Sequence, residues 1–331
     1  MGNKLCCRSV PSESVMANML KAEEDHNRTK ASKYIKEIYK IFKGFYSIKD
    51  IPFIEQAQTL KNTNEKVLQK KNEMPPFIFN RILANVEREL KKPTLVEDNA
   101  TYSGYWYTVN FRSKVTDKQD GKGVQLWPDG RYYEGYWKHG KINGYGRMYH
   151  ADGDVYEGYF RFNKAHGYGK YMHSDNSIYE GEWADDKQEG KGIEKWPDNS
   201  SYEGNFSKGV KEGSGIFKWA NGSEYMGEFS QNVFNGKGRY RWEDGKTYIG
   251  DWVNGVMQGK GTFAWPDGKK YEGSFVNDKK EGYGEMEYPD GRIFKGEWRG
   301  NLENGKGEVV YKNGTSKVGI WKMGKRELWQ T

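Results

Sequence analysis

The sequence predicts a mainly β protein in which an α-helical N-terminal block precedes an elongated, single-layer antiparallel β-meander of hairpins. The first observation is an internal repeat, because the segment Tyr-x-Gly-x-Trp and its variants recur every 23 residues from Tyr133 to Phe294. A constant period in this range is the signature of a repeat architecture. The second observation is compositional, since all 12 tryptophans and nearly all glycines lie after residue 100. The chain therefore divides into a glycine-poor N-terminal part and a long repeat region.

Each repeat reads as two strands joined by turns. In one copy, residues 179–183 and residues 190–196 alternate with a period of two, which puts their aromatic rings and glycines on one face. We expect a polar loop over residues 184–189 between these strands. Asp-Gly pairs follow most second strands, and such pairs favour tight hairpin turns because the turn requires a positive φ angle.

The aromatic face is the predicted partner-binding surface. We expect its glycines to leave bare backbone on which a neighbouring ring can lie, although glycine ordinarily weakens a strand. Burial of the rings then stabilises the sheet. Large apolar patches rarely stay uncovered, so we expect a second sheet, a helix or another copy of the chain, as in a homodimer, to cover this face. The residues assigned to it are Tyr133, Trp137, Tyr179, Trp183, Trp196, Tyr202, Trp219, Tyr225, Trp242, Tyr248, Trp252, Trp265, Tyr271 and Trp298.

The succession Tyr-x-Gly-x-Trp, Gly-x-Gly and Asp-Gly-x-x-Tyr resembles MORN (membrane occupation and recognition nexus) repeats. The resemblance covers residues 99–325, as about nine copies and a partial tenth. It implies a single-layer β-meander used for dimerisation, scaffolding and, in some members, lipid contact. Similar repeats occur in ciliary radial-spoke proteins, junctophilins, protist cytoskeletal scaffolds and the regulatory halves of some phosphatidylinositol phosphate kinases.

Residues 1–12 are expected to form a disordered N-terminus that carries an acylation signal. Removal of the initiator methionine exposes Gly2, the acceptor for N-myristoylation, although Cys6 stands where the usual signal has Ser or Thr. Cys6 and Cys7 are placed for palmitoylation, and two acyl chains anchor a protein stably where one does not. The alternative is an ordinary terminus with two incidental cysteines.

Residues 13–98 are expected to be helical. An apolar stripe flanked by lysines over residues 34–45 is typical of an amphipathic helix, which packs on neighbouring elements or, alternatively, lies on a membrane or a partner. We expect a second helix over about residues 50–71, and a third that begins at Pro75-Pro76 and ends at Pro93. The apolar face of the third helix comprises Phe79, Ile82, Leu83, Val86 and Leu90.

The first and last copies of the repeat are irregular. In the first, Gly121-Lys122-Gly123 arrives eight residues late, so residues 111–118 are expected to form an insertion loop. Gly319 and Trp321 mark a partial last copy, in line with the atypical terminal units of repeat proteins. Residues 326–331 are expected to be a tail.

No motif supports catalysis, so we predict no enzyme, no cofactor and no metal site. The histidines lack metal-ligand spacing, and the aspartates are explained as turn residues. Residues 300–306 imitate a phosphate loop but lack its Ser or Thr, and no kinase signature is present.

Residues 1–100 carry 18 Lys and Arg against 13 Asp and Glu, which is +5 of the total of +7. The repeats are thus nearly neutral, which argues against nucleic-acid binding.

Lysines at the centre of Gly-Lys-Gly lie on the face opposite the aromatic rings. We expect them to pair across strands with first-strand glutamates, and a phosphoinositide-binding stripe is the alternative. The lysines are Lys122, Lys191, Lys237, Lys260 and Lys306, and the glutamates are Glu134, Glu157, Glu180, Glu203 and Glu272.

The sequence thus predicts a non-enzymatic structural scaffold for protein–protein assembly in a ciliary or cortical cytoskeletal complex. The alternatives are an acyl-anchored membrane tether and a phosphoinositide-binding regulatory subunit of a lipid kinase. Because Cys6 and Cys7 are the only cysteines and are adjacent, they form no useful structural disulfide, and we expect an intracellular protein.

Overall fold

A computed structural model describes residues 56–57, 60–79, 88–111 and 114–330, and the side chains of these residues except those within 109–115. The chain divides between Lys164 and Ala165 into two compact units. The described residues of both units consist mainly of antiparallel strands, as the repeat pattern predicts. The predicted acylation sites Gly2, Cys6 and Cys7 lie outside the described residues.

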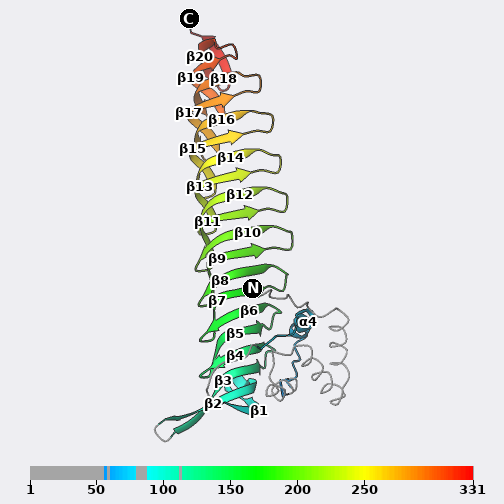
Figure 1. The fold of residues 1–331 in the computed structure, drawn as a ribbon. Coiled ribbons are helices and arrows are strands. Elements are labelled where there is room, and N and C mark those ends of the chain that lie inside the picture. The colour runs from blue at the N-terminus through cyan, green and yellow to red at the C-terminus, as the bar shows by residue number, and fades with distance from the viewer. Residues whose placement is uncertain (1–55, 58–59, 80–87, 112–113, 331) are drawn as a thin grey trace, which may run out of the picture. The chain divides into compact units, whose positions relative to one another are not determined.

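Among its described residues, the first unit is a short meander with helix α4 beside it (Figure 1). Consecutive strands pair antiparallel from β1 to β6. Asn64 caps the helix, because its side chain accepts a hydrogen bond from the amide of Val67. The elements are α4 (Glu65–Glu73), β1 (Glu89–Leu95), η2 (Glu97–Asn99), β2 (Thr101–Phe111), β3 (Lys114–Leu126), β4 (Tyr132–Lys138), β5 (Lys141–Tyr149) and β6 (Val155–Arg161).

The second unit is a single-layer meander in which the strands follow one another in chain order (Figure 1). Consecutive strands pair antiparallel from β7 to β21. The predicted meander of hairpins is therefore confirmed. The strands are β7 (Lys164–Met172), β8 (Ile178–Ala184), β9 (Lys187–Lys195), β10 (Ser201–Ser207), β11 (Val210–Lys218), β12 (Glu224–Ser230), β13 (Val233–Arg241), β14 (Thr247–Val253), β15 (Val256–Ala264), β16 (Lys270–Val276), β17 (Lys279–Glu287), β18 (Ile293–Arg299), β19 (Leu302–Val310), β20 (Ser316–Lys322) and β21 (Lys325–Trp329).

The turn inside each repeat is tighter than its polar sequence indicates. The expected loop over residues 184–189 is wrong, because β8 runs to Ala184 and β9 begins at Lys187. Only Asp185 (φ 47°) and Asp186 (φ 68°) form the turn. Positive φ at both central residues is the type I′ geometry, which Asn, Asp and Gly tolerate best. The remaining polar residues of the loop extend the strands.

The turn between repeats uses the predicted Asp-Gly pair. After β3, the Gly130 amide donates to the carbonyl of Trp127 (3.0 Å), and the Trp127 amide donates to the carbonyl of Arg131 (3.0 Å). Gly130 has φ 90°, so glycine occupies the left-handed position of a three-residue hairpin loop. The Asp129 carboxylate accepts from the Arg131 amide (3.0 Å) and fixes the loop.

Three expectations about irregular segments differ from the structure. The expected loop over residues 111–118 is not seen in its described part, because Phe111 of β2 pairs with Lys114 of β3 and residues 114–118 belong to β3. The expected third helix does not reach Pro93, because Glu89–Leu95 is a strand that pairs with β2. Pro93 lies at the register shift of that pairing, where a residue without an amide hydrogen is tolerated. The expected tail over 326–331 contributes to β21.

Candidate functional site

The tyrosine that opens each repeat is buried in its own hairpin. Tyr225 is 0% exposed, and its hydroxyl donates to the carbonyl of Glu228 (2.9 Å). Its ring lies on bare backbone, because a Cβ added at Gly227 or Gly238 would lie 2.6 or 2.4 Å from the Tyr225 hydroxyl oxygen. The same arrangement recurs at Tyr133, Tyr179, Tyr202, Tyr248 and Tyr271.

Most first-strand tryptophans are buried beside these tyrosines. The Trp252 ring meets the Tyr248 ring edge to face at 5.2 Å, and its indole N–H donates to the carbonyl of Gly238 (3.3 Å). Trp137, Trp252 and Trp298 are 6%, 4% and 3% exposed. The sequence predicts that every ring of the aromatic face is open to a partner. Trp137, Trp252 and Trp298 are instead covered by the chain itself.

The second-strand aromatic residues form a continuous surface that is only partly buried. We call it the aromatic ladder. Neighbouring ring centroids along it are 4.5–5.4 Å apart, and each of its rings is partly exposed. It runs across the sheet from the end of β9 to the end of β15. The aromatic ladder comprises Trp196, Phe217, Trp219, Tyr240, Trp242, Phe263 and Trp265.

Four members of the aromatic ladder were predicted from the sequence, and three were missed. Phe217, Tyr240 and Phe263 each lie two residues before a predicted tryptophan, so the period of two would have placed them on the same face. Trp183, also predicted, is partly buried and borders a shallow depression of about 200 Å³ that Tyr171 and other residues line.

Two lysines, neither singled out in the sequence, lie against the ends of the aromatic ladder. The Lys211 ammonium lies 5.2 Å from the centroid of the Trp196 ring and bonds the Glu194 carboxylate at 2.6 Å. The Lys280 ammonium lies 5.6 Å from the centroid of the Trp265 ring. Both attractions are of the cation–π kind.

Lys280 differs from Lys211 in that no described carboxylate forms a direct ion pair with it. Its ammonium lies 4.2 Å from the Trp298 ring centroid and has no carboxylate within 4.0 Å among the residues that the structure describes. Phe263 occupies the position in the repeat that Glu194 occupies beside Lys211. Burial lowers the pKa of Lys280 to about 8, although the charge of Glu303 opposes this shift.

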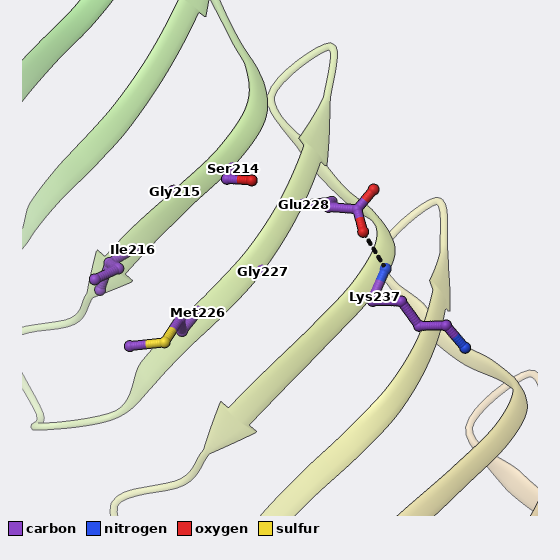
Figure 2. Close-up of a pocket in the computed structure, with 7 residues that line it drawn as sticks. All are labelled: Ser214, Gly215, Ile216, Met226, Gly227, Glu228 and Lys237. Carbon is purple, nitrogen blue, oxygen red and sulfur yellow. Dashed lines mark hydrogen bonds between the residues drawn. The ribbon is translucent and has the colours of Figure 1, made fainter.

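The face opposite the aromatic ladder is shallow and carries paired charges. A depression of about 380 Å³ lies there. Figure 2 shows Ile216, Met226, Glu228 and Lys237, which line it from neighbouring strands. The Lys237 amide donates to the Glu228 carboxylate (3.1 Å), and the Lys237 ammonium pairs with Asp251. Among the Gly-Lys-Gly lysines of the described residues, Lys237 therefore already has a carboxylate partner.

The expected pairing of Gly-Lys-Gly lysines with first-strand glutamates is wrong, because the register differs. Lys237 lies opposite Asp251, whereas Glu203 lies opposite Ile193 and Ile216. The glutamate position is thus displaced by two residues from the lysine position.

In the first unit, residues 62–79 pack against β4 and β5. The Arg147 guanidinium donates to the carbonyl of Pro75 (2.7 Å) and bonds the Glu157 carboxylate at 2.8 Å. The Phe77 ring stacks on the Tyr145 ring at 5.9 Å. The Arg147 side chain is 3% exposed, so this part of the sheet is covered by the chain's own N-terminal segment.

The described residues contain no group of three or more His, Cys, Asp or Glu side chains placed to hold a metal ion. Within the same part of the chain, no helix combines the length and the apolar character needed to span a membrane.

Comparison with known proteins identifies the repeat. The family model described as "MORN repeat" matches residues 117–130, 133–155, 156–178, 179–201, 202–224, 225–247, 248–270, 271–291 and 294–316. No curated protein matches the chain.

Solved structures show weak similarity. The TCP10 domain of Danio rerio CPAP, in complex with a peptide of Danio rerio STIL, is 13% identical with a TM-score of 0.38, and the match covers 68% of this chain and 98% of that chain. The G-box domain of the microcephaly protein CPAP is 13% identical with a TM-score of 0.34, over 61% of this chain and 100% of that chain.

Proposed function

Because the chain belongs to the MORN repeat family, which its repeats match over more than half of its length, we propose that it is a protein-interaction scaffold whose aromatic ladder binds protein partners. We place this scaffold in a ciliary or cortical cytoskeletal assembly. The observation that carries the proposal is the partial exposure of seven adjoining rings on a face whose other rings are mostly buried. Aromatic side chains concentrate at the cores of protein interfaces.

Proximity labelling in the native cell tests this proposal. A biotin ligase fused to the chain is compared between the wild type and the double variant Trp219→Ala/Trp242→Ala, with Ile249→Ala as the control. Ile249 is 54% exposed and lies on the opposite face of the same region. We expect the double variant to lose a defined set of cytoskeletal neighbours that the control retains. An unchanged set in the double variant would refute a binding role for the aromatic ladder.

An acyl-anchored tether is the second candidate, favoured by the sequence of Gly2, Cys6 and Cys7. Fractionation of wild-type and Gly2→Ala protein separates the two settings. A tether is released from membranes by mild detergent in the wild type and is already soluble in the variant. If both proteins stay in the detergent-resistant pellet, the cytoskeletal setting is supported and the tether is rejected.

A further inference from the structure

The spacing of the aromatic ladder is set by the sheet. Neighbouring antiparallel strands lie about 4.8 Å apart, and each repeat adds two strands, so equivalent rings such as Trp219 and Trp242 recur at about 9.6 Å. A ligand that presents an apolar group at the same interval can engage every repeat in turn.

A polyproline II helix has this interval. It rises about 3.1 Å per residue with three residues per turn, which gives about 9.3 Å per turn. Over the three intervals from Trp196 to Trp265 the accumulated mismatch is about 1 Å. An α-helix fits less well, because its seven-residue spacing is about 10.5 Å and its mismatch over the same length is about 3 Å.

Aromatic grooves suit such a ligand chemically. Polyproline II segments have no internal hydrogen bonds and are already extended when free, so they lose little conformational entropy on docking against aromatic side chains. The aromatic ladder supplies these side chains as rings 4.5–5.4 Å apart.

The two lysines give the ligand a charge and a direction. At one end of the aromatic ladder, the Lys211 ammonium is already paired with Glu194 at 2.6 Å. At the other end, the Lys280 ammonium beside Trp265 has no such carboxylate among the described residues. A carboxylate of the ligand would therefore pair with Lys280 and not with Lys211.

Resting on the proposed function, we propose that the aromatic ladder binds an extended, proline-rich peptide of a partner protein, with an acidic residue of that peptide at Lys280. The proposal names the class of partner segment, which the scaffold function alone leaves open.

The proposal is tested by titrating the full chain with synthetic 12-residue peptides. Binding is measured by tryptophan fluorescence or calorimetry. The probe is a polyproline peptide with one glutamate near one end. Its comparators are the same peptide with glutamine for glutamate, a Gly/Ser peptide with the same glutamate, and an amphipathic helical peptide. We expect the probe to bind at least 10-fold more tightly than the Gly/Ser and helical peptides. Equal or tighter binding of either comparator overturns the proposal.

Variants locate the site. Trp242→Ala should weaken binding of the polyproline probe at least 10-fold, whereas Ile249→Ala on the opposite face should leave its affinity unchanged. Lys280→Met keeps the sheet intact, because Met257 fills the equivalent position one repeat earlier, and it should remove the preference for glutamate over glutamine. The preference should also weaken between pH 7 and pH 9, since Lys280 loses its proton near pH 8. Binding that is indifferent to both Trp242→Ala and Lys280→Met overturns the proposal.

The two experiments distinguish failure of the proline-rich ligand from failure of the scaffold function. If proximity labelling depends on Trp219 and Trp242 but the polyproline probe does not bind, the scaffold function stands and the proline-rich ligand is rejected. If neither result appears, both proposals fail.

Discussion

The glycines beneath each tyrosine leave room for its ring, and adding one methyl group there tests this role. In Gly238→Ala, the new Cβ would lie 2.4 Å from the Tyr225 hydroxyl oxygen, so the ring or the strand must move. We expect the free energy of unfolding to fall by about 1–3 kcal/mol, as overpacking does in other cores. Urea unfolding measures the change. Lys237→Ala is the neighbouring control, because that side chain is 74% exposed. Equal losses in both variants would show that Gly238 makes no room for the ring.

Lys280 predicts a pH dependence of stability with a definite sign. Its pKa is lowered from 10.5 to about 8 in the folded chain, so above pH 8 the unfolded chain binds more protons than the folded chain. Stability from this residue therefore rises as the pH rises from 8 towards 10.5. The measurement compares thermal midpoints of the wild type and Lys280→Met from pH 7 to 9.5. We expect the gain in thermal midpoint from Lys280→Met to shrink as the pH rises. A gain that stays constant from pH 7 to 9.5 would contradict the lowered pKa of Lys280.

The type I′ turns predict opposite effects on stability when Met and Asn are exchanged between two equivalent turn positions. Met323 occupies a turn position with φ 49°, although it is 64% exposed and gains little from burial. Asn254 occupies the equivalent position with φ 50°, which asparagine adopts at lower cost. We expect Met323→Asn to stabilise the chain by about 1 kcal/mol and Asn254→Met to destabilise it by a similar amount. Chemical unfolding of both variants tests this, and changes of the same sign would refute it.

The strands and turns of the repeats were predictable because the same sequence pattern recurs in every copy. The alternation that ends at Trp196 and the Asp-Gly pairs indicate where strands and reversals lie. The N-terminal segment has no such redundancy. Leu90 completes an apolar stripe that suits a helix, yet Glu89–Leu95 pairs with β2, since an open sheet edge satisfies its backbone groups.

The candidate site was only half predictable for a physical reason. Trp196 and Trp252 share the same face and the same period, so the sequence treats them alike. The structure separates them, because Trp252 packs edge to face on Tyr248 while Trp196 stacks on Phe217 at the margin of the sheet. Likewise, whether a described carboxylate forms a direct ion pair with Lys280 depends on which residue of another repeat lies beside it, which a single repeat does not reveal.

The meander predicts that damage stays local. Strands of the second unit pair only with the strands before and after them in the chain. Repeat proteins of this kind behave as nearest-neighbour systems. We expect Tyr225→Ala to increase amide hydrogen exchange in β11 to β14 and to leave β18 to β20 close to wild type, as followed by mass spectrometry. A uniform increase over all strands would show that the unit opens as a whole.

The covering of β4 and β5 by residues 62–79 has a consequence for how the chain is made. Asn64 donates to the carbonyl of Ala151, which lies 87 residues later, whereas each hairpin joins strands that are close in sequence. At about 5–20 residues per second of synthesis, the ribosome delivers Ala151 about 4–17 s after Asn64. During that interval Val67, Phe77 and Phe79, all buried in the finished chain, have no sheet to cover them. We therefore expect the apolar side chains of the nascent segment to stay exposed until the second hairpin of the meander has been made.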